Sequence, residues 1–435
     1  MRAALAAVAA HVRTPVVRDG YALVLNSAIT AVIGLGYWIV AARVYPPEVV
    51  GVNAALISSM MFIAGVAQLN LSNILVRFVP DAGRMVRRLI VASYAVSLGV
   101  AAVAATLFVL GIGIWGDELE PVTSVRGFDV WFVAATMAWC AFVLQDSALT
   151  GLGRAVWVPA ENAVFSVAKL ALLVGFAGAA PVYGIFASWT AALLVSLVPV
   201  NLLVFGRLVP RAMRSATRDA LSVTRRELAV YVVADYAGAV AWLALTTLPP
   251  VIVAHELGAR QTAYFSLAWA IAVPIYFVPT SIGASLVVHA VRERERLEEY
   301  TRKAVVQFAR LLLPAAAALV VAGPFLLRLL GHDYAEESST VMRILVLSAI
   351  PNGVNILYVS VARVERRMSR VVAVLAGQAA ITLGLAVPLV RVDGIVGLSI
   401  AWLLGQSLVA AAIVIANRRV LVRTRVAGRA ARGEA

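Results

Sequence analysis

Long runs of uncharged apolar residues constrain this chain more than any other feature. A helix needs about 20 such residues to cross the hydrocarbon core of a bilayer. The chain is 62% hydrophobic and 14% charged, against about 45–50% and 25% in soluble domains. An all-α polytopic membrane protein is therefore predicted. The clearest runs are Leu89–Trp115, Leu170–Gly206, Gln261–Val288, Val371–Val390 and Gly394–Asn417.

About twelve transmembrane helices fit these runs. The run from Leu170 to Gly206 is too long for one helix and divides at the turn-forming residues 177–181. The predicted spans are 20–42, 49–76, 88–114, 128–150, 155–177, 183–206, 228–250, 262–288, 306–330, 341–362, 370–390 and 394–416. The predicted units are a cytoplasmic interfacial segment (1–19), an N-terminal six-helix bundle (20–210), a cytoplasmic linker (211–227), a C-terminal six-helix bundle (228–416) and a basic cytoplasmic tail (417–435).

The positive charges of the chain, whose net charge is +14, are distributed unevenly between the two sides of this predicted topology. Of the 37 Lys and Arg residues, 29 fall in the termini and even-numbered loops, and six fall in the odd-numbered loops and their flanks. The positive-inside rule then places both termini in the cytoplasm. We expect a multi-pass protein of a bacterial plasma (inner) membrane, with its basic loops on anionic lipids and no nucleic acid as partner.

The two six-helix bundles carry a weak internal repeat. A shift of 212 places residues 42–51 on residues 254–263, and a shift of 210 places Gly184-Ile185 on Gly394-Ile395. Because six is an even number of spans, both bundles have the same orientation, so the repeat is parallel, as in several transporter classes. Two parallel bundles around a central cavity suit alternating access.

Four short segments give the chain a family resemblance. They are residues 41–51 (AARVYPPEVVG), residues 70–80 (NLSNILVRFVP), Gly331-His332-Asp333-Tyr334 and Gly394-Ile395-Val396-Gly397. In this order they resemble the polysaccharide biosynthesis (Wzx-type) flippases of the MOP superfamily, relatives of MATE exporters and MurJ, over about residues 18–420. The resemblance implies a MATE-like fold. It also implies movement of an undecaprenyl-diphosphate-linked oligosaccharide from the cytoplasmic to the outer leaflet.

The clearest charged residues inside predicted spans are Asp146, Glu161, Lys169 and Asp235. A charge near the bilayer centre costs roughly 2.5–3.5 kcal/mol on insertion scales, so each is a candidate functional residue. The acids lie near the cytoplasmic ends of their spans and Lys169 lies deeper. Lys169 is the first candidate for binding a diphosphate. The alternative is an ion pair between Lys169 and Asp146 or Glu161 that joins two spans.

Amide side chains extend the predicted substrate site. Asn162 shares a polar stripe with Lys169. In the second span Ser59, Asn70, Asn73 and Arg77 are predicted on one helical face, and their groups suit sugar hydroxyls and phosphate oxygens. The alternative makes the asparagines interhelical hydrogen-bond partners and Arg77 a cytoplasmic flank.

No cofactor is expected, because Cys140 is the single cysteine and the four histidines are scattered. The carboxylates Asp146 and Asp235 are candidates for a coupling ion, and the sequence leaves H⁺ and Na⁺ open. Tyr37, Trp38 and Tyr45 are expected in an interfacial aromatic belt.

Two other functions remain open. One is a MATE-type, cation-coupled exporter of drugs or metabolites, for which acidic residues would outnumber basic ones inside the membrane. The other is a membrane glycosyltransferase or ligase, which needs acids or bases on a substantial outer loop, whereas the first outer loop is only Arg43–Glu48. A transporter rather than an enzyme is predicted. Its expected partners are a lipid-linked glycan and the glycosyltransferases or polymerase of the same pathway.

Overall fold

The computed structural model describes residues 33–112, 126–216 and 225–430, without the side chains of 225–235, 292 and 417–430. The regular elements in these ranges are all helical, as predicted. The interfacial segment 1–19 and the first part of the first predicted span lie outside the described residues. So do residues 217–224 of the predicted linker, and the side chains of the basic tail.

The N-terminal half, defined here as residues 33–216, begins with the helix Ile33–Val44. Its further helices are α3 (Pro47–Ala67), α4 (Leu71–Phe78), η1 (Gly83–Met85), α5 (Val86–Leu110), α8 (Phe128–Gly151), α9 (Trp157–Phe176), α10 (Gly184–Leu203), the π-helical turn η3 (Val204–Leu208) and α11 (Val209–Arg214).

The C-terminal half, residues 225–430, follows with longer helices. They are α12 (Arg225–Leu257), α13 (Ala259–Ala272), η4 (Val273–Tyr276), α14 (Phe277–Arg292), η5 (Arg294–Arg296), α15 (Leu297–Leu330), α16 (His332–Val364) and α17 (Met368–Ala430).

Most of the predicted spans coincide with described helices. Within residues 33–112, 126–216 and 225–430, ten helical stretches are long and apolar enough to cross a membrane, and Ile33–Val44 is a shorter apolar helix. The last two predicted spans are both in α17, where Asp393 and Gly394 have non-helical backbone angles that divide two helices. The chain is therefore a polytopic, all-α membrane protein.

One predicted span is broken. Leu69 and Asn70 have positive φ angles of 49° and 61°, so α3 ends at Ala67 and α4 begins at Leu71. The prediction that Ser59, Asn70, Asn73 and Arg77 share one helical face is therefore wrong. The two left-handed residues change the direction of the chain, so helical periodicity does not continue from α3 into α4.

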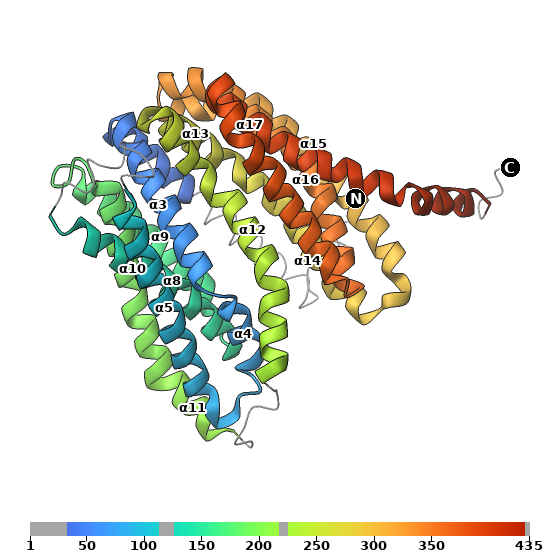
Figure 1. Ribbon diagram of the computed structural model, residues 1–435, viewed down its shortest axis with the longest axis horizontal. Helices are drawn as coiled ribbons and strands as arrows, with labels where there is room; N and C mark the ends of the chain where they lie inside the picture. The colour runs from blue at the N-terminus through green and yellow to red at the C-terminus, as the bar shows by residue number, and fades with distance from the viewer. Residues whose placement is uncertain (1–32, 113–125, 217–224, 431–435) are drawn as a thin grey trace, which may run out of the picture.

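The two halves meet closely at the end where α13 begins (Figure 1). A Cβ atom on Gly51 of α3 would lie 1.7 Å from the carbonyl oxygen of Ala259 in α13, so only glycine permits this approach. Beside it, Arg260 Nε lies 2.7 Å from Glu48 Oε1. Positions 48 and 260 differ by 212, the shift of the internal repeat, so equivalent positions meet across this contact.

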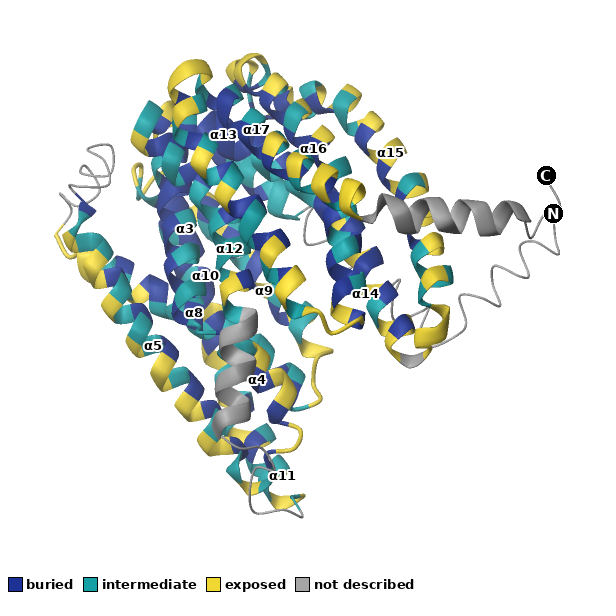
Figure 2. Ribbon diagram, turned by 45° about the vertical axis from the view of Figure 1, so that its right-hand side comes forward, coloured by how far each residue is buried: buried dark blue, intermediate teal, exposed yellow. Residues whose placement is uncertain are grey.

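The guanidinium of Arg43 adds a second connection between the halves at this end. Its Nε donates to the carbonyl oxygen of Leu329 at 2.7 Å, and its Nη2 donates to that of Arg328 at 3.3 Å. These carbonyls belong to the last turn of α15, where a helix has unpaired acceptors. Figures 1 and 2 show the opposite ends of the halves, near α11 and α14, diverging. By the predicted topology this divergent end is cytoplasmic.

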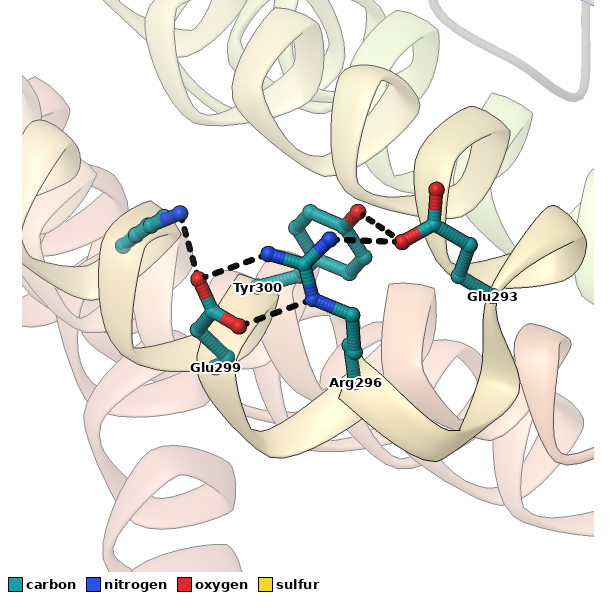
Figure 3. A network of polar contacts seen from close by, with 5 residues as sticks. Glu293, Arg296, Glu299 and Tyr300 are labelled. Carbon is teal, nitrogen blue, oxygen red and sulfur yellow. Dashed lines mark hydrogen bonds and ion pairs between the residues drawn. The ribbon is translucent and has the colours of Figure 1, made fainter.

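A solvated turn joins α14 to α15 at the divergent end. Arg296 contacts Glu293 (2.8 Å) and Glu299 (2.9 Å), and Tyr300 donates a hydrogen bond to Glu293 (Figure 3). The hydrogen bond from Tyr300 and the contact with Arg296 lower the pKa of the Glu293 carboxyl. This cluster is exposed, so it closes the turn with little expected effect on stability.

Candidate functional site

Two predicted residues form a carboxyl pair inside the N-terminal half, the half-buried Asp146 of α8 and the buried Glu161 of α9. Their side chains lie within hydrogen-bonding reach of each other. Gln145 Nε2 donates to Glu161 Oε1 at 3.0 Å, and Asn162 Nδ2 approaches Asp146 Oδ2 at 3.4 Å. Asn201 of α10 donates to Gln145 Oε1 at 2.8 Å. Three helices therefore converge on this pair.

The carboxyl pair has spare capacity for a proton. Asp146 Oδ1 and Glu161 Oε2 are buried and receive no hydrogen bond from a donor in the described part of the chain. Two ionised carboxylates can only accept, so the contact between them becomes a hydrogen bond only when one is protonated. The pair is thus a site that can gain or release a proton or hold a small cation.

Lys169 occupies a different environment on the same helix. Its side chain is 6% exposed, and its Nζ lies 4.0 Å from the ring centroid of Trp189, 4.9 Å from that of Tyr37 and 5.1 Å from that of Phe165. These three rings, here called the aromatic cage, come from α10, the helix Ile33–Val44 and α9. The ammonium is held by cation–π contacts on three sides.

The expected alternative, an ion pair between Lys169 and Asp146 or Glu161, is wrong for the described conformation. The ion pairs of the described residues do not include Lys169. The physical reason is distance, because eight residues separate Glu161 from Lys169, or about 12 Å along α9 at 1.5 Å per residue. The carboxyl pair and the cationic cage are two separate features of one bundle.

Tyr37 is a core residue, and the prediction of an interfacial belt is wrong for it and for Tyr45. Both are buried, and Tyr37 is fully so. The Tyr37 hydroxyl donates to the carbonyl oxygen of Ile185 at 2.9 Å and lies 2.9 Å from Ser188 Oγ. Trp38 packs edge-on against the Tyr37 ring. Sequence position near a span end was the signal used, and it does not report the side of the helix.

The predicted residues Asn70, Asn73 and Arg77 lie at the break between α3 and α4. Asn73 Nδ2 donates to Asn70 Oδ1 at 2.6 Å, while Arg77 is exposed and its guanidinium lies 5.4 Å from the Phe78 ring centroid. Tyr236 of α12 donates to the carbonyl oxygen of Val66 at 2.7 Å, so α12 contacts this break. The neighbouring Asp235 is in α12, and its side chain lies outside the described residues.

A second buried polar group, here called the amide cluster, occupies the C-terminal half. Gln406 Oε1 accepts from Asn352 (3.0 Å), Asn355 (3.3 Å) and Gln378 (2.6 Å). These four side chains come from α16 and both parts of α17. Sequence analysis missed Gln145, Asn201, Gln378 and Gln406; their signal was a polar amide within an apolar run.

Comparison with known proteins agrees with this architecture. The MatE family model matches residues 239–388, and none of the curated proteins compared matches the chain by sequence. Among solved structures, the lipid II flippase MurJ in an inward closed conformation superposes with a TM-score of 0.69 at 10% identity, covering 91% of this chain and 87% of MurJ. The chain has the MOP-superfamily fold.

Two further solved structures with this fold are of transporters. The MATE multidrug transporter DinF-BH, solved as a complex with a ligand, has a TM-score of 0.65 at 14% identity and covers 93% of this chain and 96% of its own. A MOP superfamily transporter from Pyrococcus furiosus has a TM-score of 0.55 at 14% identity, covering 92% and 95%. Its binding pocket is described as reversed in polarity, suggesting a different function.

Proposed function

We propose that the chain is an alternating-access flippase. It would move an undecaprenyl-diphosphate-linked oligosaccharide from the cytoplasmic to the outer leaflet for cell-surface polysaccharide synthesis. The observation that carries the proposal is Lys169, a buried ammonium held by aromatic faces with no carboxylate partner among the described residues. Such a charge lacks a counter-ion and favours an anionic group such as a diphosphate.

The arrangement of the halves supports a cycle with access from one side at a time. The contacts of Gly51, Glu48 and Arg43 join the halves at the predicted outer end, and the halves diverge at the predicted cytoplasmic end (Figure 1). A headgroup would enter from the cytoplasm and leave after the outer contacts separate. Asn162, Asn70, Asn73 and Arg77 are proposed to contact the glycan and phosphate groups.

The carboxyl pair is the proposed site of ion coupling. Its two oxygens without donors suit either a proton or Na⁺, and Asp235 is a further candidate acid. Coupling would consist of neutralising the pair in one conformation and releasing the ion in the other. Basic loops would contact anionic lipids, and glycosyltransferases or a polymerase of the same pathway are the proposed protein partners.

A MATE-type exporter of cationic compounds is the second candidate. It is supported by the MatE match over residues 239–388 and by the MOP fold shared with a multidrug transporter. The carboxyl pair adds negative charge to the N-terminal half. Lys169 opposes this function because its charge repels a cation from the same bundle.

Deletion of the gene and complementation test the flippase proposal. Loss of surface glycan with accumulation of a lipid-linked intermediate inside the cell is expected. In the complementation assay, Lys169→Ala is expected to fail and Lys169→Arg to restore part of the activity. The matched control is Lys303→Ala, since Lys303 is the other lysine of the chain and forms an exposed ion pair with Glu299. Normal glycan in the deletion strain would refute the proposal.

A further inference from the structure

The cage around Lys169 has the composition of a site for an organic cation. Three π faces from three helices surround one ammonium at 4.0–5.1 Å, and aromatic cages of this kind bind quaternary ammonium ligands in other proteins. The carboxyl pair lies on the same bundle but is separate from the cage, about 12 Å away along α9. In this chain, however, the ligand of the cage is the protein's own side chain.

The rings are held in place by contacts that do not involve Lys169. The Tyr37 hydroxyl is bonded to Ile185 and Ser188. The Trp189 ring packs against Tyr37 at 5.7 Å, against Phe165 at 5.8 Å and against Trp139 at 6.1 Å between centroids. Removal of the lysine side chain would therefore leave an aromatic cage that is already formed, so a ligand would not have to order it.

We propose that Lys169 is a tethered cation that occupies the aromatic cage and excludes organic cations from it. Exclusion has two causes. The side chain fills the space between the rings, and its charge repels a second cation at close range. Lys169 is then a specificity-determining residue that disfavours cationic compounds. Proteins use repulsive groups of this kind to reject a wrong ligand.

This inference rests on the cage geometry and does not depend on the flippase proposal. It holds for any anionic or neutral substrate that the chain moves. It also explains how a protein that shares its fold with a multidrug transporter could reject organic cations. The two proposals have separate readouts, surface glycan for the first and cation binding for the second.

Binding of radiolabelled tetramethylammonium to the purified full-length protein in detergent tests the inference. We expect Lys169→Ala to bind this cation at least tenfold more tightly than the unaltered protein, because the empty cage accepts it. Lys169→Arg keeps the charge and Lys169→Met fills the space, so both are expected to bind as weakly as the unaltered protein. Lys303→Ala is the matched control for loss of a lysine and is expected to change nothing.

Two results would overturn the proposal. One is equal affinity of Lys169→Ala and the unaltered protein, both eluting as folded monodisperse species. The other is binding by Lys169→Ala that survives the additional change Trp189→Leu, which removes the ring nearest to Nζ and is expected to reduce the gained affinity at least fivefold. If Lys169→Ala does not fold, Lys169→Ser takes its place in both comparisons with the same expected gain.

Discussion

The interiors of the two halves are built from different polar chemistry. The N-terminal half buries charged groups, the carboxyl pair and Lys169, while the C-terminal half buries the amide cluster. Among its described side chains, the buried polar groups of the C-terminal half are neutral. Amides have donors and acceptors for one another but cannot gain or lose a proton, whereas carboxyls can. From this difference we propose that ion-dependent and charge-dependent steps use the carboxyl pair and Lys169 of the N-terminal half, with Asp235 of α12 as a further candidate acid, and that the amide cluster has a structural role.

Charge reversal at Lys169 is expected to have the largest effect and tests the role of buried charge in the N-terminal half. Lys169→Glu would place a carboxylate against three π faces and add a third acid to the bundle. We expect transport to be abolished and the free energy of unfolding to fall by about 3–5 kcal/mol, the range for an uncompensated buried charge. Thermal unfolding in detergent and glycan complementation measure the two effects. Lys303→Glu is the control, and an unchanged melting temperature in Lys169→Glu would contradict the assignment.

The amide cluster should matter for stability and not for ion dependence. Gln406→Leu removes the side-chain oxygen that three amides share and leaves the donors of Asn352 and Gln378 without this acceptor, while Asn355 keeps its hydrogen bond to the backbone carbonyl of residue 406. We expect a loss of about 1–3 kcal/mol in the free energy of unfolding, the range for buried unsatisfied polar groups. The dependence of transport on pH and Na⁺ should be unchanged. The exposed Gln307→Leu controls for loss of a glutamine, and altered ion dependence in Gln406→Leu would move coupling into the C-terminal half.

Neutralisation of the carboxyl pair should give the opposite pattern. Glu161→Gln keeps the size of the side chain and offers an amide donor to Asp146, so the free energy of unfolding should change by about 1 kcal/mol or less. The response of transport to an imposed H⁺ or Na⁺ gradient should be lost, and whichever gradient drives the unaltered protein identifies the ion. The exposed Glu365→Gln is the control. A retained gradient response would remove the pair from coupling.

The smallest effect is expected where the halves touch. Arg260 and Glu48 form an ion pair whose side chains are 63% and 49% exposed, so Arg260→Gln should cost about 0–1 kcal/mol. The effect should shrink at high salt because exposed charges are screened. Thermal unfolding at low and high salt measures both. A larger loss of unfolding free energy that is the same at low and high salt would contradict this expectation. It would show that the contact between the halves stabilises the protein as much as the buried polar groups do.

The positions of the helices were predictable because hydropathy is a local property. The apolar runs located the described helices, some of them with ends that differ by up to about nine residues, and they placed the division between α9 and α10 at residues 177–181. Asp146, Glu161, Asn162 and Lys169 stood out for the same reason, as polar residues in apolar spans, but the contact between Asp146 and Asn162 was not predicted. The break at Leu69 and Asn70 carried a weaker signal, because Asn adopts a left-handed backbone more readily than most residues but Leu does not.

The sequence alone determined that this chain crosses a membrane many times as an all-α protein, which residues carry charge into the spans, and how the loops divide by charge. These features follow from composition and order along the chain. The tertiary structure decided the partner of each buried polar group: rings for Lys169, a carboxyl for Asp146 and a glutamine for Asn352. The partner of a buried side chain depends on how helices that are distant in sequence rotate and pack against one another. Neither the rotation nor the packing can be deduced from the residues that neighbour the side chain in the sequence.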